Sequence, residues 1–301
     1  MSIQDITVVI TSFKSDEKIK DCLNSINTNC KVLIIENSND IEFKKKIEKE
    51  FRNAECILTG KNLGYGAANN IGLKKVITKY ALILNPDTFL ESSTLDEFFK
   101  IVKTTKSFAI IGPYIQEYDE KGKKNGIHKN HTSVNEELGL HKNVKPLADL
   151  NLRIVENVKG FAMFLNLSEF KNIGFFDENF FIYFEEIDLC RRVVNANKKI
   201  YLAPSIKINH SGGQSHNDAI NQEMELSRNW HWMWSTFHYY KKYDGFFVAL
   251  IKIFNKFFSS AVKFLFYFII FNKMMSKIYY QRFSGIINSI LGNKSWYRPK
   301  V

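Results

Sequence analysis

Near the middle of its first half the chain reads Tyr80-Ala81-Leu82-Ile83-Leu84-Asn85-Pro86-Asp87-Thr88, an apolar run that stops at a proline and an acid. Such an unbroken apolar run predicts a buried strand of a parallel sheet, and Pro86 prevents the strand from continuing past Asn85. We therefore expect Asp87 at the carboxyl edge of the sheet, where open α/β sheets bind ligands. A turn in which Asp87 helps to cap a helix is the alternative interpretation of this stretch alone.

The segments around this run alternate between strand and helix patterns from Asp5 to about Tyr114. Strands are expected at 6–10, 32–35 and 56–58, and helices ending at about Asn29, Phe51 and Thr78. This alternation predicts an α/β fold with a mostly parallel central sheet and flanking helices. Later strands are expected from about Val155 to Leu165, at 199–202, and at 206–209 just before His210.

The composition favours a folded protein with a sizeable core. The 301 residues are 45% apolar, which suggests one large domain or one domain with an appendage. The four cysteines form no CxxC pair and have no histidine at zinc spacing, so neither a disulfide framework nor structural zinc is expected. The N-terminal residues do not resemble a signal peptide, and we expect a protein of the reducing cytoplasm.

The positive charge is concentrated at the C-terminal end. Residues 241–301 contain eleven Lys or Arg and one acid, Asp244, so this segment carries +10 of the net charge of +11. We expect a separate, basic and Phe-rich helical tail there, preceded by a domain that spans 1–240.

The tail contains an apolar segment, 246–270, that three lysines interrupt, so it does not reach the ~18 apolar residues of a transmembrane helix. On a helix Lys252, Lys256 and Lys263 fall within about 40° of one another. Apolar residues cover the other side: Phe254, Phe257, Phe258, Ala261, Phe264, Leu265 and Phe268. This pattern predicts an amphipathic helix on an anionic membrane surface, repeated at about 274–291.

Two alternatives for the tail remain open. The helices would also suit packing against the preceding domain or an interface between two copies of the chain. Nucleic-acid binding is not expected, because the segment is Phe-rich and carries no known nucleic-acid-binding motif.

Small and polar residues gather at 61–72, where Gly64 and Gly66 would let a backbone approach a ligand closely, beside a helix N-terminus that favours phosphate. The loop matches neither the Walker pattern nor the strict GxGxxG pattern, and a tight structural loop is the alternative.

A second polar cluster follows an aromatic run at 175–184, where Glu185, Glu186 and Asp188 stand at the start of a predicted helix. These acids complement the helix dipole, and Asp188 is spaced to pair with Arg192. Their apolar surroundings would also raise a carboxylate pKa toward that of a useful base.

Taken in order, these motifs resemble glycosyltransferase family 2, the inverting enzymes of GT-A fold, and especially its bacterial rhamnosyltransferase-like branch. The resemblance covers about residues 5–240. It rests on five segments: Thr11-Ser12-Phe13, Glu36-Asn37-Ser38, 62–72, Leu84-Asn85-Pro86-Asp87-Thr88 and 181–189.

The resemblance implies roles for particular residues. Thr11, Ser12, Glu36 and Asn37 would lie near the nucleotide base and ribose, and Asn62, Gly64 and Asn69 along the ribose and diphosphate. Asn85 and Asp87 occupy the position of the family's DxD motif, so Asp87, with His210, would hold Mg²⁺ or Mn²⁺.

Glu186 stands at the catalytic base position, with Glu185 and Asp188 as neighbours. Residues 1–115 would form the nucleotide-sugar-binding half and 116–240 the acceptor half.

The resemblance implies an inverting, metal-dependent hexosyltransferase. Its donor would be a dTDP- or UDP-sugar, and its acceptor a lipid-linked or polysaccharide glycan, as in surface polysaccharide or O-antigen synthesis at the inner face of the plasma membrane. A nucleotidyltransferase is a rival enzyme, but the residues after the first strand are not its Gly-rich phosphate loop. A membrane-surface scaffold or glycan-binding protein with a degenerate site is the non-enzymatic alternative.

Overall fold

The computed structural model describes residues 2–16, 18–105, 107–118, 124–128, 145–146, 152–210 and 220–300. Internal contacts divide the chain into two compact units. The first, the sheet unit, comprises Met1–Phe176 and Glu186–Asn217. The second, the helical unit, comprises Asp177–Glu185 and Asp218–Val301.

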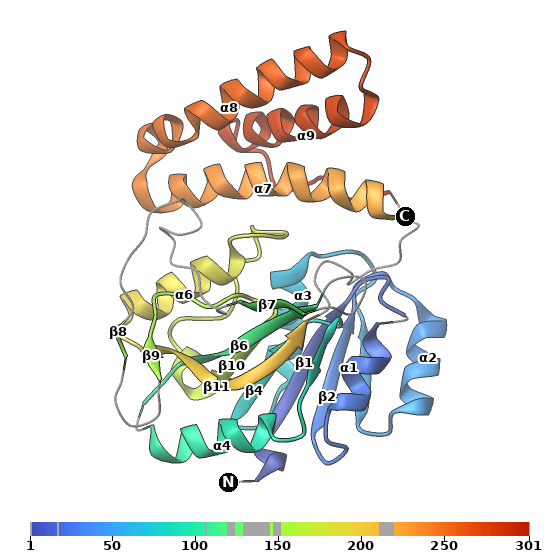
Figure 1. The fold of residues 1–301 in the computed structure, drawn as a ribbon, viewed down its shortest axis with the longest axis vertical. Helices are drawn as coiled ribbons and strands as arrows, with labels where there is room; N and C mark the ends of the chain where they lie inside the picture. The colour runs from blue at the N-terminus through green and yellow to red at the C-terminus, as the bar shows by residue number, and fades with distance from the viewer. Residues whose placement is uncertain are drawn as a thin grey trace. The chain divides into compact units, whose positions relative to one another are not determined.

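The sheet unit begins with four parallel strands in the order β3-β2-β1-β4 (Figure 1). Their bounds are β1 (Ile6–Ser12), β2 (Lys31–Glu36), β3 (Ala54–Leu58) and β4 (Tyr80–Leu84). All five residues of β4 are buried, as the apolar run predicts. Because these four strands are parallel, their carboxyl ends lie along one edge of the sheet.

An antiparallel strand, β10 (Ala162–Asn166), continues the sheet between β4 and β6 (Ile110–Tyr118). Beyond β6 lie β11 (Ile200–His210), which is parallel to it, and then β9 (Arg153–Ile154) and β8 (Lys145–Pro146). Two further strands pair off this path, β5 (Thr88–Leu90) with β11 and β7 (Lys124–His128) with β6. The predicted α/β fold with a mostly parallel sheet and flanking helices is confirmed.

Helices cover both faces of this sheet, and alternate strand residues pack against each layer. Val8 and Ile10 share one apolar core with residues of α1, α2 and α4, whereas Val9 and Ile35 share the other with residues of α3 and α6. The helices are α1 (Ile19–Ser25), α2 (Ile41–Glu50), α3 (Tyr65–Lys75), α4 (Thr94–Thr104) and α6 (Glu185–Asn195), with short 3₁₀ helices at Ile3–Asp5 and Leu167–Phe170.

Two strand predictions need correction. The strand expected from Val155 begins only at Ala162, and Val155 instead follows β9, with its N–H donating to the Ile200 carbonyl of β11 at 3.1 Å. The strands expected at 199–202 and 206–209 form one strand, β11, whose pairing with β6 shifts register between Ala203 and Lys207.

All four cysteines are buried thiols. Burial raises the pKa of Cys22 and of Cys190 to about 12, so neither side chain is a thiolate at neutral pH.

The helical unit consists of three long helices that pack on one another: α7 (Asn221–Asp244), α8 (Phe246–Ile269) and α9 (Lys273–Ile290). Gly245, with φ of 85°, turns the chain between α7 and α8. A Cβ on Gly285 would overlap the carbonyl of Trp230, so α9 approaches α7 closely at this point. The boundary expected at 240 lies inside α7.

The C-terminal segment of the helical unit is anchored to α7 by buried polar contacts. His231 is fully buried, with Nε2 2.8 Å from the Tyr297 carbonyl oxygen and Nδ1 3.1 Å from Ser295 Oγ. These contacts fit a neutral ring that donates from Nε2 and accepts at Nδ1. Burial, with a smaller contribution from the cation of Arg298, lowers the pKa of His231 to about 3.

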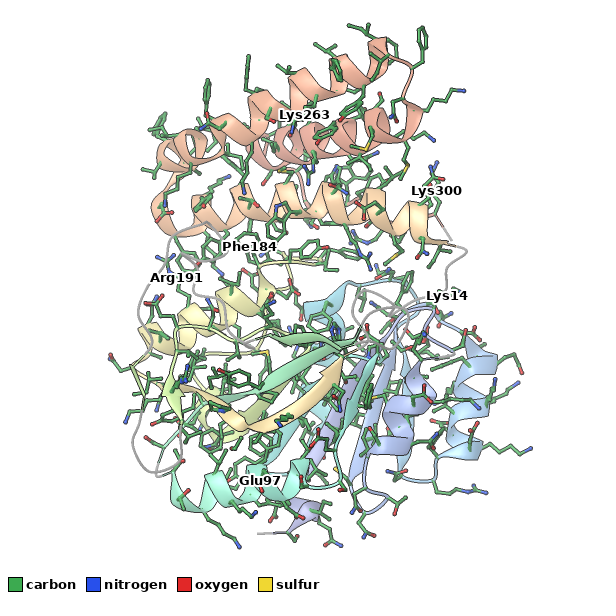
Figure 2. The ribbon with its side chains drawn as sticks, in the orientation of Figure 1. Lys14, Glu97, Phe184, Arg191, Lys263 and Lys300 are labelled. Carbon is green, nitrogen blue, oxygen red and sulfur yellow. The ribbon has the colours of Figure 1, made fainter. Side chains whose placement is uncertain are left out.

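Helix α8 presents a broad apolar face away from α7 and α9 (Figure 2). Phe247 is 79% exposed, Ile251 75%, Phe254 63% and Phe258 62%. Further exposed apolar residues are Val248, Val262, Leu265, Phe266, Phe268 and Ile269. Among the described residues, none of the helices has the length and apolar character needed to cross a membrane.

The lysines of α8 lie differently from the simple stripe that the sequence predicts. The ammonium of Lys252 lies 4.6 Å from the ring centre of Tyr240 and pairs with Asp244 at 2.8 Å, and that of Lys263 lies 5.3 Å from the ring of Tyr279. Phe257 and Phe264, expected on the free apolar side, pack instead against Phe283 and Tyr280 of α9. The lysines therefore border the packed side of α8, and the exposed side is apolar.

Candidate active site

The carboxyl ends of β1 and β2 bring the first group of predicted residues together. Ser12 pairs in register with Glu36, and the Asn37 backbone N–H donates to the Ser12 carbonyl at 2.8 Å. Thr11, Ser12 and Glu36 are all buried. Burial raises the pKa of Glu36, although hydrogen bonds from Ser38, including one from its N–H at 2.6 Å, offset part of this effect.

Asn37 and Asn62 fix the loop that leads into α3. The Asn37 amide donates to Asn62 Oδ1 at 3.0 Å and to the Gly64 carbonyl at 3.3 Å, and its Oδ1 accepts from the Leu63 N–H at 2.9 Å. Gly64 has φ of 89°, a left-handed conformation that glycine adopts without strain, and α3 begins directly after it. The loop therefore holds a helix N-terminus beside the ends of β1 and β2.

Asn69 lies on the buried side of α3. Its Nδ2 donates to the Tyr65 carbonyl at 3.0 Å. Within the described part of the chain, no group donates a hydrogen bond to its buried Oδ1. A buried amide oxygen without a donor is costly, which marks this position as one that a bound ligand would satisfy.

The end of β4 forms a hydrogen-bonded turn. The Thr88 N–H donates to the Asn85 carbonyl at 3.2 Å, and the Thr88 hydroxyl donates to the same oxygen at 2.7 Å. Pro86 takes the second position of the turn, which suits its fixed φ. The turn places Asp87, which is 4% exposed, beyond the sheet edge as the sequence predicts.

Pairing of β5 with β11 brings His210 to Asp87. The register sets His210 opposite Thr88, so its ring lies beside the neighbouring acid, with Nε2 3.5 Å from Asp87 Oδ2. The ring of Phe161 stacks on His210 at 4.6 Å between centroids. Residues 123 positions apart in the chain thus meet at one site.

The Asp87 region has hard oxygen donors of the kind that divalent cations bind. For Asn85 Oδ1 and Asp87 Oδ1, both buried, the described residues supply no hydrogen-bond partner. No cluster of three or more His, Cys, Asp or Glu that would hold a metal occurs among the described residues. Asn85 and Asp87 would therefore supply only part of the ligands of a Mg²⁺ or Mn²⁺ ion, and a bound diphosphate or water would supply the rest.

Glu186 lies beside the start of α3. Gly160 lies beside both side chains: a Cβ at this position would be 3.5 Å from Glu186 Cβ and 3.4 Å from Tyr65 Cε1, which are ordinary van der Waals distances. The Tyr65 hydroxyl donates to the Gly160 carbonyl. Glu186 therefore lies near Tyr65, the first residue of α3, which follows the loop that Asn37 and Asn62 shape.

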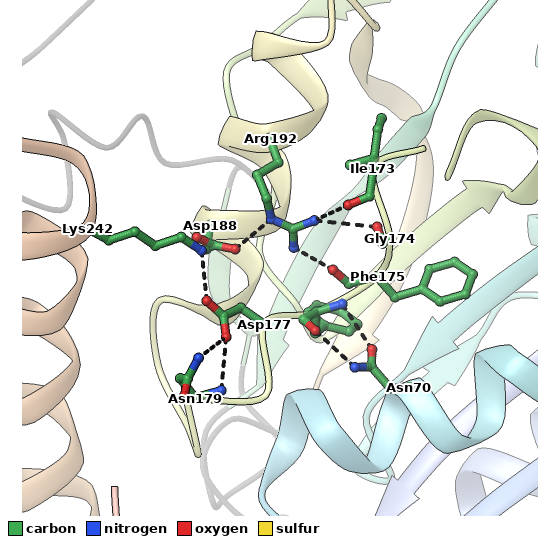
Figure 3. A network of polar contacts seen from close by, with 10 residues as sticks. Asn70, Ile173, Gly174, Phe175, Asp177, Asn179, Asp188, Arg192 and Lys242 are labelled. Atoms are coloured by element: carbon green, nitrogen blue, oxygen red, sulfur yellow. Dashed lines mark hydrogen bonds and ion pairs between the residues drawn. The ribbon is translucent and has the colours of Figure 1, made fainter. Parts of the chain in front are cut away.

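Asp188 has a structural partner. Its Oδ2 accepts from Arg192 Nε at 2.8 Å, and Arg192 Nη1 donates to the Ile173 carbonyl at 2.8 Å (Figure 3). The i,i+4 pair predicted from spacing is confirmed. Asp188 thus orients Arg192, and Arg192 closes the turn that precedes residue 176.

Glu185, the third predicted catalytic acid, is grouped with the helical unit and is buried. Tyr183 and Phe184 just before it both have φ of 69°, a rare conformation for bulky residues. Within the helical unit Ser235 Oγ donates to the Ile182 carbonyl at 3.0 Å, and Trp232 contacts both rings. Helix α7 therefore holds this strained backbone in place.

Another polar contact within the helical unit fixes the start of this segment (Figure 3). Lys242 Nζ lies 2.7 Å from Asp177 Oδ2, and the Asn179 N–H donates to Asp177 Oδ1 at 3.0 Å. Burial alone would raise the pKa of Asp177, but these hydrogen bonds outweigh it and hold the pKa below its ordinary value.

The sequence analysis assigned no role to Gly160, nor to Tyr65 and Asn70, although the last two lie in the segment 62–72 that carries the resemblance. Asn70 exchanges two hydrogen bonds of 2.9 Å with the backbone of Phe176, which ties α3 to the segment before the acids (Figure 3). Gly160 owes its position to the antiparallel insertion of β10, a long-range pairing without a local signal. In the sequence, the paired amides Asn69-Asn70 on an otherwise apolar helix face were the sign that Asn70 makes a specific polar contact.

Comparison with known proteins identifies the family. A model described as glycosyl transferase family 2 matches residues 7–190. The low-salt glycan biosynthesis hexosyltransferase of Haloferax volcanii is 28% identical over 207 residues, which are 66% of this chain and 64% of that protein. The rhamnosyltransferase WbbL of Escherichia coli is 26% identical over 249 residues, 78% of this chain and 92% of that protein.

A third relative is more distant. The N-acetylglucosaminyl-diphospho-decaprenol L-rhamnosyltransferase of Mycobacterium tuberculosis is 21% identical and covers 61% of this chain and 67% of its own length.

Solved structures show the same fold at low identity. Residues 1–349 of S. aureus TarS match 97% of this chain and 93% of that one, with a TM-score of 0.53 and 14% identity. GalNAc-T7 with UDP, GalNAc and Mn²⁺ matches 68% of this chain and 43% of that one, with a TM-score of 0.54 and 12% identity. The fold is therefore of the GT-A type, and the chain belongs to glycosyl transferase family 2.

Proposed function

We propose that this glycosyltransferase is an inverting, metal-dependent enzyme that moves a hexose, rhamnose or a similar sugar, from a dTDP- or UDP-sugar to a lipid-linked glycan. The observation that carries the proposal is the set of buried oxygens without partners at one sheet edge, which is Thr11 Oγ1, Asn69 Oδ1, Asn85 Oδ1 and Asp87 Oδ1 among the described residues. Polar atoms left without partners in a folded core suit a polar ligand. The names of the relatives support hexosyl transfer in glycan synthesis.

The donor would lie along the ends of β1, β2 and α3. Thr11, Ser12 and Glu36 suit the base and ribose, since the hydroxyls and carboxylate are buried at adjacent strand ends. Asn37 shapes the loop of Asn62 and Gly64, whose backbone opens a helix N-terminus toward a diphosphate.

Asp87, His210 and Asn85 would hold the divalent cation. When bound, such an ion offsets the negative charge that grows on the departing nucleoside diphosphate. The chain itself keeps the Asp87 carboxylate buried beside His210. The pairing of β5 with β11 and the stacking of Phe161 on the His210 ring hold the histidine in place.

Glu186 is the proposed base that takes a proton from the acceptor hydroxyl as it attacks the anomeric carbon. It belongs to the sheet unit, beside Gly160 and Tyr65 at the donor loop, whereas Glu185 is grouped with the helical unit. Asp188 acts as a positioning residue through Arg192.

The exposed apolar face of α8 is proposed to enter a lipid surface, where its burial would be favourable. Anionic lipid is the occupant that the charge favours, because residues 241–301 carry a net charge of +10. This assignment agrees with a peripheral enzyme at the inner face of the plasma membrane that meets a lipid-linked acceptor in surface polysaccharide synthesis.

A transfer assay with candidate nucleotide sugars and a lipid-diphosphate-linked saccharide tests the proposal. We expect release of nucleoside diphosphate coupled to a product whose new anomeric linkage, read by NMR, is inverted relative to the donor. A retained configuration would exclude the single-displacement role of Glu186. Glycan binding without any diphosphate release would favour a scaffold with a degenerate site.

A further inference from the structure

The helical unit contains a pocket of about 300 Å³ that the donor site does not use. Its lining combines three kinds of side chain: the aromatic Tyr183 and Trp232, the cationic Arg228 and Arg282, and the polar Glu225 and Asn229. Four of these residues, 225, 228, 229 and 232, recur at the spacing of one helix face on α7. The volume is at the lower end of the ~300–1,000 Å³ typical of ligand pockets.

A relay of hydrogen bonds holds Arg282 in this pocket. Glu225 Oε1 accepts from Asn229 Nδ2 at 2.7 Å, and Asn229 Oδ1 accepts from Arg282 Nε at 2.7 Å. No acceptor is described for the Nη1 and Nη2 groups of Arg282 in the portions of the chain that the structure covers. The acid therefore serves to orient the guanidinium, whose terminal N–H groups remain available for a ligand.

The charges of the pocket favour an anion. Two guanidiniums oppose one carboxylate, and the ammonium of Lys256 lies 5.8 Å from the ring centre of Trp232. A planar guanidinium presents paired N–H donors that match two oxygens of a phosphate, which an oriented arginine binds more selectively than a lysine does.

One wall of the pocket belongs to the strained segment before the acids. The rings of Tyr183 and Trp232 meet edge to face at 5.2 Å. Tyr183 stands two residues before Glu185, so their Cα atoms are at most about 7 Å apart. Tyr183 and Phe184 have positive φ, which bulky residues keep mainly where the surrounding structure enforces it, often at functional sites. The position of Tyr183 in the pocket wall is therefore fixed by its surroundings.

We infer that this pocket binds the phosphate of the acceptor, the diphosphate that joins the acceptor sugar to its lipid. The inference rests on the proposed function and adds the residues that would recognise the acceptor. Arg282 and Arg228 would grip phosphate oxygens, while Tyr183 and Trp232 would offer aromatic surface to the adjoining sugar or isoprenoid.

The test compares two acceptors that carry the same saccharide, one on a prenyl diphosphate and one on a neutral alkyl chain. For Arg282→Gln we expect the KM for the diphosphate acceptor to rise at least tenfold, while the KM for the neutral acceptor changes less than twofold. Arg282→Lys should restore only part of the affinity for the diphosphate acceptor, because lysine keeps the positive charge but lacks the paired N–H donors of the guanidinium. Lys277→Gln, an exposed cation on the same helix, is the matched control and should change neither KM.

Three results would overturn the inference. An unchanged KM for the diphosphate acceptor in Arg282→Gln would remove the role of the pocket. An equal rise for both acceptors would indicate a structural effect, and a rise in the KM of the nucleotide sugar alone would assign the pocket to the donor. If the unaltered protein releases no nucleoside diphosphate from any sugar nucleotide, the proposed function itself fails, which the first two results would not imply.

Discussion

The sheet unit and the helical unit depart from ordinary burial in opposite ways. At the sheet edge, polar atoms such as Asp87 Oδ1 and Asn69 Oδ1 are buried with no partner among the described residues. On α8, large apolar side chains such as Phe254 and Phe258 are exposed. Each arrangement costs free energy in isolation, and each would be relieved by a different class of ligand.

The two surfaces differ in the chemistry of the ligand that would cover them. Buried oxygens without partners suit a charged, polar donor and its cation, whereas an uncovered apolar helix face suits lipid. The proposed transfer from a nucleotide sugar to a lipid-linked acceptor would use both kinds of surface. The following predictions test whether each surface does what its chemistry indicates.

The largest effect is expected from Glu186→Gln. Loss of the general base should lower kcat for transfer by roughly 10²–10⁴-fold while the donor still binds. Steady-state transfer kinetics and donor titration check this outcome. The isosteric change at the adjacent acid, Glu185→Gln, should cost less than tenfold, and a reversed order of the two variants would move the base to Glu185.

A smaller but clear effect is expected from the pair Phe254→Ser and Phe258→Ser on α8. Removing two exposed aromatic side chains should weaken binding to anionic vesicles by roughly tenfold or more, because their transfer into lipid is lost. Vesicle co-sedimentation measures this. Ile77→Ser, which removes an apolar side chain that is 91% exposed in the sheet unit, is the control and should leave vesicle binding as it was. Equal binding by the double variant would show that α8 does not enter lipid.

Packing inside the helical unit should respond to Gly285→Ala. The added Cβ would overlap the Trp230 carbonyl, so α9 must move away from α7, at a cost of about 1–3 kcal/mol. Thermal unfolding followed by near-UV circular dichroism of the tryptophans reports the loss. Lys277→Ala, at an exposed position of the same helix, should unfold like the unaltered protein; a similar drop in both would deny the close contact.

The smallest effect concerns His231 and pH. Its pKa is about 3 in the folded chain and near 6.5 when exposed, so the unfolded state binds the proton first as pH falls. The free energy of unfolding contributed by the neutral ring is therefore complete above about pH 6.5 and declines toward pH 3. When the pH falls from 7.5 to 5, the free energy of unfolding should drop by about 1–2 kcal/mol less in His231→Gln than in the unaltered protein. Denaturant titrations at both pH values measure this difference. Identical pH profiles would mean that His231 binds its proton at the same pH in the folded and the unfolded state.

The sequence was most informative where structure is local or repeated. Apolar runs such as 80–84 predicted the parallel strands, and parallel strands share a carboxyl edge, so the meeting of Ser12, Glu36 and Asn85 near that edge followed from topology. The Asp188–Arg192 pair followed from helical spacing alone. The family resemblance then supplied roles that geometry alone does not give.

Pairings between distant segments were not predictable in the same way. The antiparallel β10 brings Gly160 next to Glu186, and the β5–β11 ladder brings His210 to Asp87, although no local pattern encodes either register. On α8 the helical period was predicted correctly. The partners α7 and α9 decided which aromatic side chains became buried, and so turned Phe257 and Phe264 inward.

Metal-dependent release of nucleoside diphosphate tests the central claim most directly. The unaltered protein should release it from a dTDP- or UDP-sugar with Mn²⁺ or Mg²⁺ and lose this activity with EDTA. Asp87→Asn should lose both the metal response and metal-dependent donor binding, while Glu186→Gln should keep metal-dependent binding. Release by Asp87→Asn equal to that of the unaltered protein would contradict the assignment of the metal and donor site to this sheet edge.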